Sequence, residues 1–333
     1  MSGPGSVATD KSTGAQLEHW ASLIGTIAAP ITILGALLFY FGYVSSASEY
    51  AYFGINVDTI GLSTQAYIMR SPQTLLVPLL VLTLASAGFL TLNAAVHKRI
   101  TAAVTTDASA IQAQRVRRIK RRAQRSRLFG LAAVAVGFIM LFGYQYMRDW
   151  PIYGLVTPLL IGIGAGIVAY TSHILNLLHR LEGQQRWGAA KDSQSAWSMH
   201  DQDGGSLLAR RTAGVFVYVL IAASVFWATA TVAQWSGRGL AEYAAIHFDA
   251  LPSVILDTKE QLWLHDPPPV EVTTLHTSEG QTFHYRYRGL RLLIVGQDRM
   301  FLVPAVWSPH DTTLIVPLDG SVRIQFQFEN QAP

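Results

Sequence analysis

Few side chains in this chain combine a reactive type with a useful spacing. The chain has no cysteine, so disulfides, thiolate catalysis and cysteine-ligated metal sites are excluded. It also lacks His-Glu-x-x-His, Gly-x-Ser-x-Gly and a phosphate-binding loop that ends in Gly-Lys-Ser or Gly-Lys-Thr. We therefore expect a protein that is not an enzyme and that holds no cofactor and no metal ion.

His173 is the titratable residue that lies inside a long apolar run. Ionisable side chains inside a membrane are costly and often functional, so His173 is a candidate for a gating or proton-transfer role. It lies one to two turns from the end of its run, which favours a simpler interpretation in which the imidazole reaches the polar interface. The apolar runs contain no Asp, Glu, Lys or Arg, and this weakens the case for an ion-coupled transporter.

The densest charge in the chain is a basic block between residues 97 and 127. This stretch holds ten of the 25 Lys and Arg residues and a single acid, Asp107. Such a block favours contact with anionic lipid headgroups, and the alternative is a solvated helix that only fixes the orientation of the chain. We expect no nucleic-acid partner, because the positive charge is confined to this one segment. The candidate lipid contacts are Arg115, Arg117, Arg118, Lys120, Arg121, Arg122, Arg125 and Arg127.

Two weaker sets of polar residues remain. Glu49, Asp58 and Asp149 would lie near one membrane face, where a lipid-modifying enzyme would need carboxylates. Arg286, Arg288 and Arg291 flank Gly289 and suggest an anion-binding patch, although acids on adjoining strands are the simpler partners.

The elements that carry these residues are apolar segments of membrane length. Half of the residues are hydrophobic and 14% are charged, whereas soluble domains average about 25% charged. Uncharged runs of this length are typical of transmembrane helices. We predict five spans, at residues 21–44, 74–96, 128–146, 152–178 and 212–234 of a membrane domain 21–235. Residues 1–20 read as a flexible cytoplasmic tail.

The connections between the predicted spans differ in character. Residues 109–127 contain no Pro or Gly, so we expect one basic helix that continues into the third span. Residues 45–73 are unusually apolar and aromatic; they favour short helices at the membrane interface, with a lid or re-entrant segment as the alternative. Gly162 and Gly166 are spaced as a small-xxx-small pattern and are candidate helix-packing residues, within the chain or in a homo-oligomer.

Charge asymmetry predicts the orientation of the chain. With the basic block inside, the two cytoplasmic loops carry fifteen Lys and Arg residues, whereas the two outer loops carry two, Arg70 and Arg148. Short loops rich in Lys and Arg stay in the cytoplasm. We therefore predict a multi-pass protein of the plasma membrane, with a cytoplasmic N-terminus and an extracytoplasmic C-terminal domain.

Residues 236–333 change from helical to strand periodicity. Ser236-Gly-Arg-Gly239 reads as a hinge, and from Pro252 apolar and polar residues alternate. Phe283, Tyr285 and Tyr287 alternate with His284, Arg286 and Arg288. About six or seven short strands predict a small all-β domain, an antiparallel sandwich or an open barrel. The predicted fold class is thus a five-span α-helical transmembrane bundle with a β domain.

Two stretches carry a family resemblance. Residues 53–65, Phe-Gly-Ile-Asn-Val-Asp-Thr-Ile-Gly-Leu-Ser-Thr-Gln, and residues 285–293, Tyr-Arg-Tyr-Arg-Gly-Leu-Arg-Leu-Leu, resemble segments of uncharacterised multi-span membrane proteins of high-GC Gram-positive bacteria. The resemblance implies a bacterial membrane protein and no particular activity.

The function that these observations favour is non-enzymatic. We expect an envelope binding, sensing or scaffold protein that sits in the lipid bilayer, contacts anionic lipids and recognises a protein or envelope ligand with its β domain. The first alternative is an oligomeric channel or transporter component, and the second is the lipid-modifying enzyme.

Overall fold

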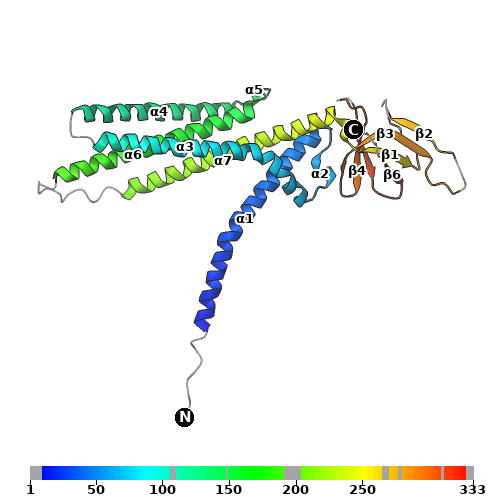
Figure 1. Ribbon diagram of the computed structural model, residues 1–333, viewed down its shortest axis with the longest axis horizontal. Helices are drawn as coiled ribbons and strands as arrows, with labels where there is room; N and C mark the ends of the chain where they lie inside the picture. Colours follow the sequence, from blue (N-terminus) through cyan, green and yellow to red (C-terminus); the bar gives the residue numbers. More distant parts are fainter. Residues whose placement is uncertain are drawn as a thin grey trace, which may run out of the picture. The chain divides into compact units, whose positions relative to one another are not determined.

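The computed structural model describes residues 10–105, 110–147, 149–190, 204–264, 270–276, 280–308 and 311–327. Its helices are α1 (Asp10–Tyr52), α2 (Val57–Ile60), α3 (Thr64–Thr105), α4 (Ala110–Phe142), α5 (Tyr144–Met147), α6 (Tyr153–Ala190) and α7 (Gly204–Ile246) (Figure 1). Its strands are β1 (Ser253–Thr258), β2 (Glu271–Thr274), β3 (Tyr285–Val295), β4 (Arg299–Pro304), β5 (Leu314–Pro317) and β6 (Val322–Gln327).

Five of the described helices are long and apolar enough to cross a membrane. The candidate spans are Ala28–Tyr52, Thr64–Lys98, Arg117–Phe142, Tyr153–Leu178 and Thr212–Ile246. They match the five predicted spans in order, so the prediction of five long apolar helices followed by a separate antiparallel sheet is confirmed. The predicted tail differs, because α1 is already helical from Asp10.

Helices α1, α3, α6 and α7 extend further than their predicted spans. The stretch predicted as a loop, residues 45–73, contains the end of α1, all of α2 and the start of α3. The predicted hinge at Ser236–Gly239 is wrong, because α7 continues through it to Ile246. Gly237 serves close packing there: a Cβ added to it would lie 2.0 Å from the carbonyl oxygen of Ser45 in α1.

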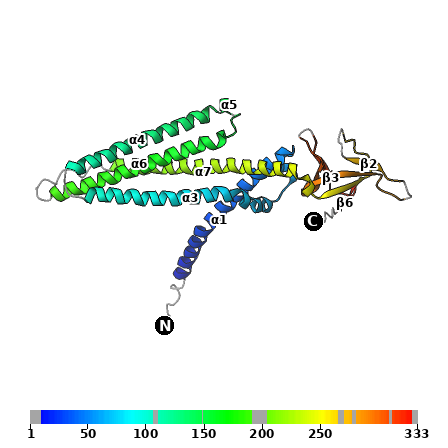
Figure 2. The same ribbon diagram turned by 45° about the horizontal axis from the view of Figure 1, so that its top comes forward.

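The basic helix has the predicted form. A single helix, α4, runs from Ala110 to Phe142 and joins the basic segment to the third apolar stretch without a break. α5 and a short connection lead back into α6, which lies alongside α4 in both views (Figures 1 and 2). The two helices are antiparallel, since Gly130 meets Gly164 while Gly137 meets Ile161.

The chain divides into two compact units. One unit, here called the sheet unit, contains Met1–Leu76 and Ala233–Pro333; the other, the helical unit, contains Val77–Val232.

The strands of the sheet unit form one antiparallel sheet. Its order is β5-β4-β3-β1-β6, and β2 pairs with the first half of β3. All six described strands belong to this sheet, and within the described residues β5 and β6 at its two ends do not pair with each other. The six described strands agree with the predicted number, but the sheet is single and open, so the two-sheet sandwich is wrong.

A bulge in β3 determines which of its residues share a face. Gly289 has a φ of +80°, a conformation that glycine adopts without strain. Between Val254 and Leu256 the register with β1 shifts by one residue, so that Leu256 faces Tyr287 and Val254 faces Leu290. Tyr287 and Leu290 therefore enter the same core, together with Val254, Leu256, Met300, Leu302 and Val316.

Candidate functional site

Strand β4 is buried on both faces. Met300 and Leu302 join the core that involves β1 and β3, whereas Phe301 and Val303 point the other way and are fully buried there. A strand covered on both sides loses its alternation of apolar and polar residues. The run Met300-Phe-Leu-Val303 has no such alternation, which is the sequence signal of a second covered face.

The cover on the second face comes from residues far away in the sequence. Phe301 and Val303 pack with residues of the α1–α3 region and of the segment around the end of α7, in what we call the docking cluster. Its buried members are Tyr50, Phe53, Ile55, Val57, Ile60, Tyr67, Ala241, Phe248, Phe301 and Val303.

Hydrogen bonds fix this packing at two points. The Thr313 hydroxyl donates to the backbone carbonyl of Phe53 over 2.8 Å, and the backbone N–H of Gln297 donates to the backbone carbonyl of Ile60 over 3.2 Å. Trp307 lies beside the first point, with its ring centroid 5.3 Å from those of both Tyr52 and Phe53. Most of the large apolar residues of the segment 45–73 are thus packed with the sheet, a contact that neither the interfacial nor the re-entrant prediction included.

The docking cluster also changes the predicted domain boundary. The sheet does not stand alone as residues 236–333, because one of its faces is completed by the end of α1, by α2 and by the start of α3. With α7 unbroken through residues 236–239, the sheet is held to these helices without a flexible joint.

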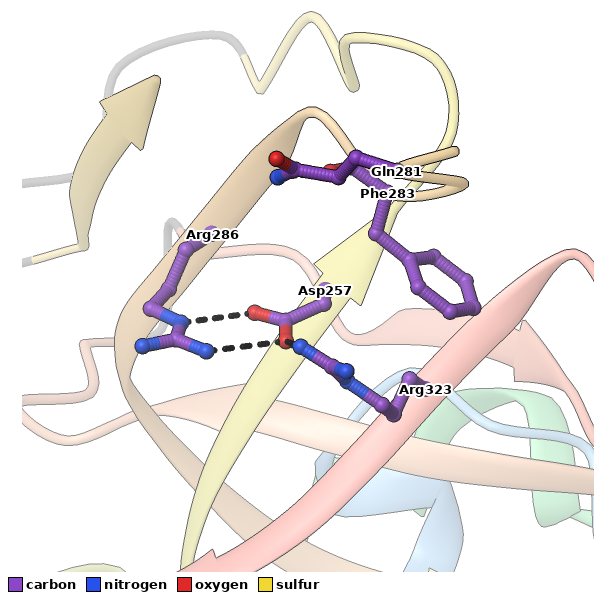
Figure 3. A network of polar contacts seen from close by, with 5 residues as sticks. All are labelled: Asp257, Gln281, Phe283, Arg286 and Arg323. Carbon is purple, nitrogen blue, oxygen red and sulfur yellow. Dashed lines mark hydrogen bonds and ion pairs between the residues drawn. The ribbon is translucent and has the colours of Figure 1, made fainter. Parts of the chain in front are cut away.

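A charged cluster occupies another part of the sheet. The Asp257 side chain is fully buried between β3 and β6 and accepts hydrogen bonds from Arg286 and Arg323 (Figure 3). The Arg286 Nε lies 2.8 Å from Oδ1, and the Arg323 Nη2 lies 2.6 Å from Oδ2. The Arg323 guanidinium also lies over the Phe283 ring, 5.1 Å from its centroid.

This cluster follows from the pairing of the strands. Asp257 is directly opposite Arg286 on β3 and opposite Arg323 on β6, and residues opposite each other on adjacent strands interact. Arg286 therefore has a structural partner, as the simpler interpretation expects. Both guanidinium groups remain accessible, with 24% and 47% of their side chains exposed.

The charges of the cluster alter the ionisation of Asp257. Burial by itself raises the pKa of this carboxyl, but the hydrogen bonds and charges of Arg286 and Arg323 outweigh burial and hold the pKa below its usual value. A carboxylate whose pKa is lower in the folded state contributes stability above its unfolded pKa of about 3.9. That contribution is lost as the pH falls through the folded pKa.

We predict that Asp257→Asn destabilises the sheet unit at neutral pH by about 1–3 kcal/mol, because two partly buried guanidinium groups lose their counter-charge. The difference from wild type should stay constant from pH 7 to about 5 and then shrink as the pH falls below about 4 towards 2. Thermal unfolding followed by tryptophan fluorescence across this pH range would measure it. Glu260→Gln, an exposed neighbour, is the matched control for the loss of one negative charge. A difference that stays constant over this whole range would contradict the assignment.

The acids considered for a lipid-modifying enzyme are differently placed. Glu49 accepts a hydrogen bond from Arg70 at 3.3 Å, and Asp58 accepts one from the Tyr43 hydroxyl at 3.1 Å. Asp149 is exposed and belongs to the helical unit. The first two carboxylates already serve the packing of α1 against the segment that follows it. No group of three or more His, Asp or Glu residues with metal-binding geometry occurs among the described residues.

In the helical unit the basic residues of α4 divide between different surroundings. Arg122 and Arg125 line a groove with residues of α3 and α6. Arg127 lines a second cavity, of about 570 Å³, with residues of α6 and α7. Arg117, Arg118 and Arg121 are exposed and Lys120 is half-buried, whereas the Arg115 side chain lies outside the part that the structure describes.

His173 lies in the second cavity. It is exposed there beside Ser172 and Asn176, and Arg127 and Tyr218 contribute from α4 and α7. The structure thus brings together two residues that the sequence singled out separately, His173 and Arg127. The predicted role in gating or proton transfer stays a prediction.

The glycine contacts of α6 differ in part from the predicted pattern. Gly162 faces α7, where an added Cβ would lie 2.9 Å from the Cβ of Ser224. Gly166 has open space around it, so within the chain the prediction is wrong for this residue. The close contact with α4 is made by Gly164, whose added Cβ would lie 2.8 Å from the carbonyl oxygen of Gly130.

Comparisons with protein-family models, with curated proteins and with solved structures find no match to this chain. The resemblance of residues 53–65 and 285–293 to multi-span proteins of high-GC Gram-positive bacteria therefore stays a prediction. Both stretches belong to the sheet unit, where the first supplies Ile55, Val57 and Ile60 to the docking cluster.

Proposed function

We propose that the protein is a multi-pass plasma-membrane protein that recognises an envelope component with its sheet unit and passes the bound state on to its spans. The N-terminus is cytoplasmic and the sheet lies outside the cell. The observation that carries the proposal is the docking cluster, because it joins the sheet to the ends of helices that are candidate spans. A ligand that shifts the sheet also shifts these helix ends.

The docking cluster supports five crossings. Residues 50–67 join the end of the first candidate span to the start of the second, and the sheet follows the fifth. With an odd number of spans after the N-terminus, these two segments lie on the same side of the membrane and are able to pack together. With four or six spans they would be separated by the bilayer. The fifteen-to-two bias of Lys and Arg then supports the outside as their location.

The proposed recognition surface is the polar region around Asp257. The docking cluster covers Phe301 and Val303 of β4, in another part of the sheet, whereas Arg286 and Arg323 stay partly exposed. Partly exposed guanidinium groups held in place by a buried carboxylate suit an anionic group on an envelope polymer or protein. The proposed protein therefore binds an anionic envelope component through a cationic surface whose guanidinium groups are held in place.

The absence of native cysteine makes this proposal testable in the full-length chain. Single cysteines at the exposed positions Thr273, Gln325 and Gln124 would be reacted, in intact cells, with a membrane-impermeant maleimide that carries a photo-activated crosslinker. We expect Thr273→Cys and Gln325→Cys to react and Gln124→Cys to react only after permeabilisation. After illumination, Gln325→Cys should form a discrete crosslinked product.

Two results would contradict the proposal. Labelling of Gln124→Cys in intact cells would reverse the orientation. If Gln325→Cys is labelled but forms no crosslinked product, although Arg286 and Arg323 are intact in that chain, the proposed orientation stands and the proposed binding function is wrong. Replacing Arg323 by Gln in the Gln325→Cys chain is the matched control, and it should weaken the crosslink.

The alternative, an oligomeric channel or transporter component, has less support. It relies on Pro30, which lies inside the apolar part of α1, on small-residue helix faces and on an apolar first loop. The apolar residues of that loop pack against the sheet, and Gly162 and Gly164 pack within the chain. The cavity with Arg127 and His173 is the feature that favours it.

A further inference from the structure

A groove in the helical unit is bounded by three helices. Its volume is about 790 Å³, which falls in the range of small-molecule sites. Val96 of α3 and Ile119 and Phe129 of α4 form part of its wall, and Ile167 and Ile174 of α6 form the rest of the apolar surface. The groove therefore offers an apolar lining large enough for hydrocarbon chains.

The polar residues of the groove are cationic or neutral. Arg122 and Arg125 belong to the lining, together with Ser126 and Thr171, and the lining contains no Asp or Glu. Arg122, Arg125 and Ser126 are exposed. They lie within the first turns of the candidate span Arg117–Phe142, where a lipid headgroup would be. Two guanidinium groups with this spacing suit a phosphate diester, which accepts several charge-assisted hydrogen bonds.

Tyr170 adds an independent observation. Its ring lines the groove and packs against Phe89 of α3, with ring centroids 5.5 Å apart. Its hydroxyl is buried and has no hydrogen-bond partner among the described residues. A buried hydroxyl without a partner costs free energy, and an acceptor oxygen brought by a ligand would remove that cost.

We infer that this groove is a specific site for one anionic diacyl phospholipid of the inner leaflet. Arg122 and Arg125 hold the phosphate, the Tyr170 hydroxyl donates to it, and the acyl chains lie along Phe129 and Ile167. The inference uses the proposed membrane location and adds to the proposed function, because it concerns the helical unit and the opposite membrane face. If basic helices were only attracted to anionic surfaces in general, every arginine of α4 would contribute about equally to lipid binding. In the inferred site, binding depends on Arg122 and Arg125.

The test uses the purified full-length chain from bilayers of phosphatidylcholine and phosphatidylglycerol in equal proportion. Native mass spectrometry would count the lipids that stay bound. We expect one phosphatidylglycerol per chain and little phosphatidylcholine. The variant Arg122→Gln/Arg125→Gln should lower this retention about tenfold or more, as expected for the loss of two charge-assisted contacts.

Two controls separate a site from diffuse attraction. Arg117→Gln/Arg121→Gln removes the same charge from exposed positions of the same helix that do not line the groove, and it should retain the lipid like wild type. Tyr170→Phe removes one hydroxyl and keeps the ring. It should lower retention several-fold while leaving the lipid-free protein equally stable or slightly more stable.

Three outcomes would overturn the inference: equal loss in both arginine pairs, equal retention of the two lipids, or full retention in Tyr170→Phe. None of them bears on the recognition surface of the sheet unit, which the cysteine experiment tests separately.

Discussion

Gly237→Ala should destabilise the protein by about 1–3 kcal/mol or more, the usual cost of overpacking. The added methyl group would lie 2.0 Å from the carbonyl oxygen of Ser45. That oxygen belongs to the backbone of α1, so a change of side-chain rotamer cannot relieve the clash. α1 and α7 would have to separate at the point where both approach the sheet. Thermal unfolding of the full-length chain in detergent or nanodiscs would measure the loss.

The neighbouring Gly239 provides the matched control. It lies on the same helix, two residues further on, and has open space around an added Cβ. Gly239→Ala should be neutral or stabilising by about 0.5–1 kcal/mol, because alanine is the better helix former. Gly42→Ala, with Tyr67 O at 2.0 Å, should behave like Gly237→Ala. If the substitutions at Gly237 and Gly239 change the stability by the same amount, α1 and α7 do not approach each other closely at Gly237.

Residues 236–333 expressed alone should aggregate. The fragment lacks α1, α2 and α3, so Phe301, Val303 and Trp307 lose the residues that cover them in the docking cluster. A contiguous apolar patch of this kind on a free sheet is an aggregation site. Solubility and size-exclusion chromatography of the fragment would show the result.

A paired substitution makes this prediction specific. Phe301→Thr/Val303→Thr keeps good strand formers and should increase the soluble fraction of the fragment. In the full-length chain the same pair should destabilise by about 3–5 kcal/mol, because it removes buried side chains of the docking cluster. A fragment that is soluble and monomeric without the substitutions would show that the sheet is independent of α1–α3.

The parts of the fold that follow from local pattern were predictable. The absence of Pro and Gly from residues 109–127 predicts that the basic segment continues into the third span as one helix, α4. Apolar runs of membrane length predict the five long helices. Strand periodicity placed Tyr285 and Tyr287 on one face and Arg286 on the other, as observed. These features depend on neighbours within a few residues.

The parts that depend on distant partners were not predictable. An apolar, aromatic segment such as residues 45–73 is stabilised equally well by a membrane interface and by the face of a sheet, so its composition does not distinguish them. The sequence predicts a hinge at Gly237, because a glycine that allows bending and a glycine that allows close approach look the same in one sequence. The cavity shared by Arg127 and His173 likewise requires the packing of α4, α6 and α7.

The hydrogen bond between Thr313 and Phe53 joins residues 260 positions apart. At about 5–20 residues per second, a ribosome needs roughly 13–50 s to add that length of chain. In the proposed topology, the aromatic segment after α1 reaches the cell exterior first and stays without its cover until the carboxyl end has been exported. In that topology the apolar segment stays exposed during biogenesis and is open to binding by an extracytoplasmic chaperone until the last strands arrive.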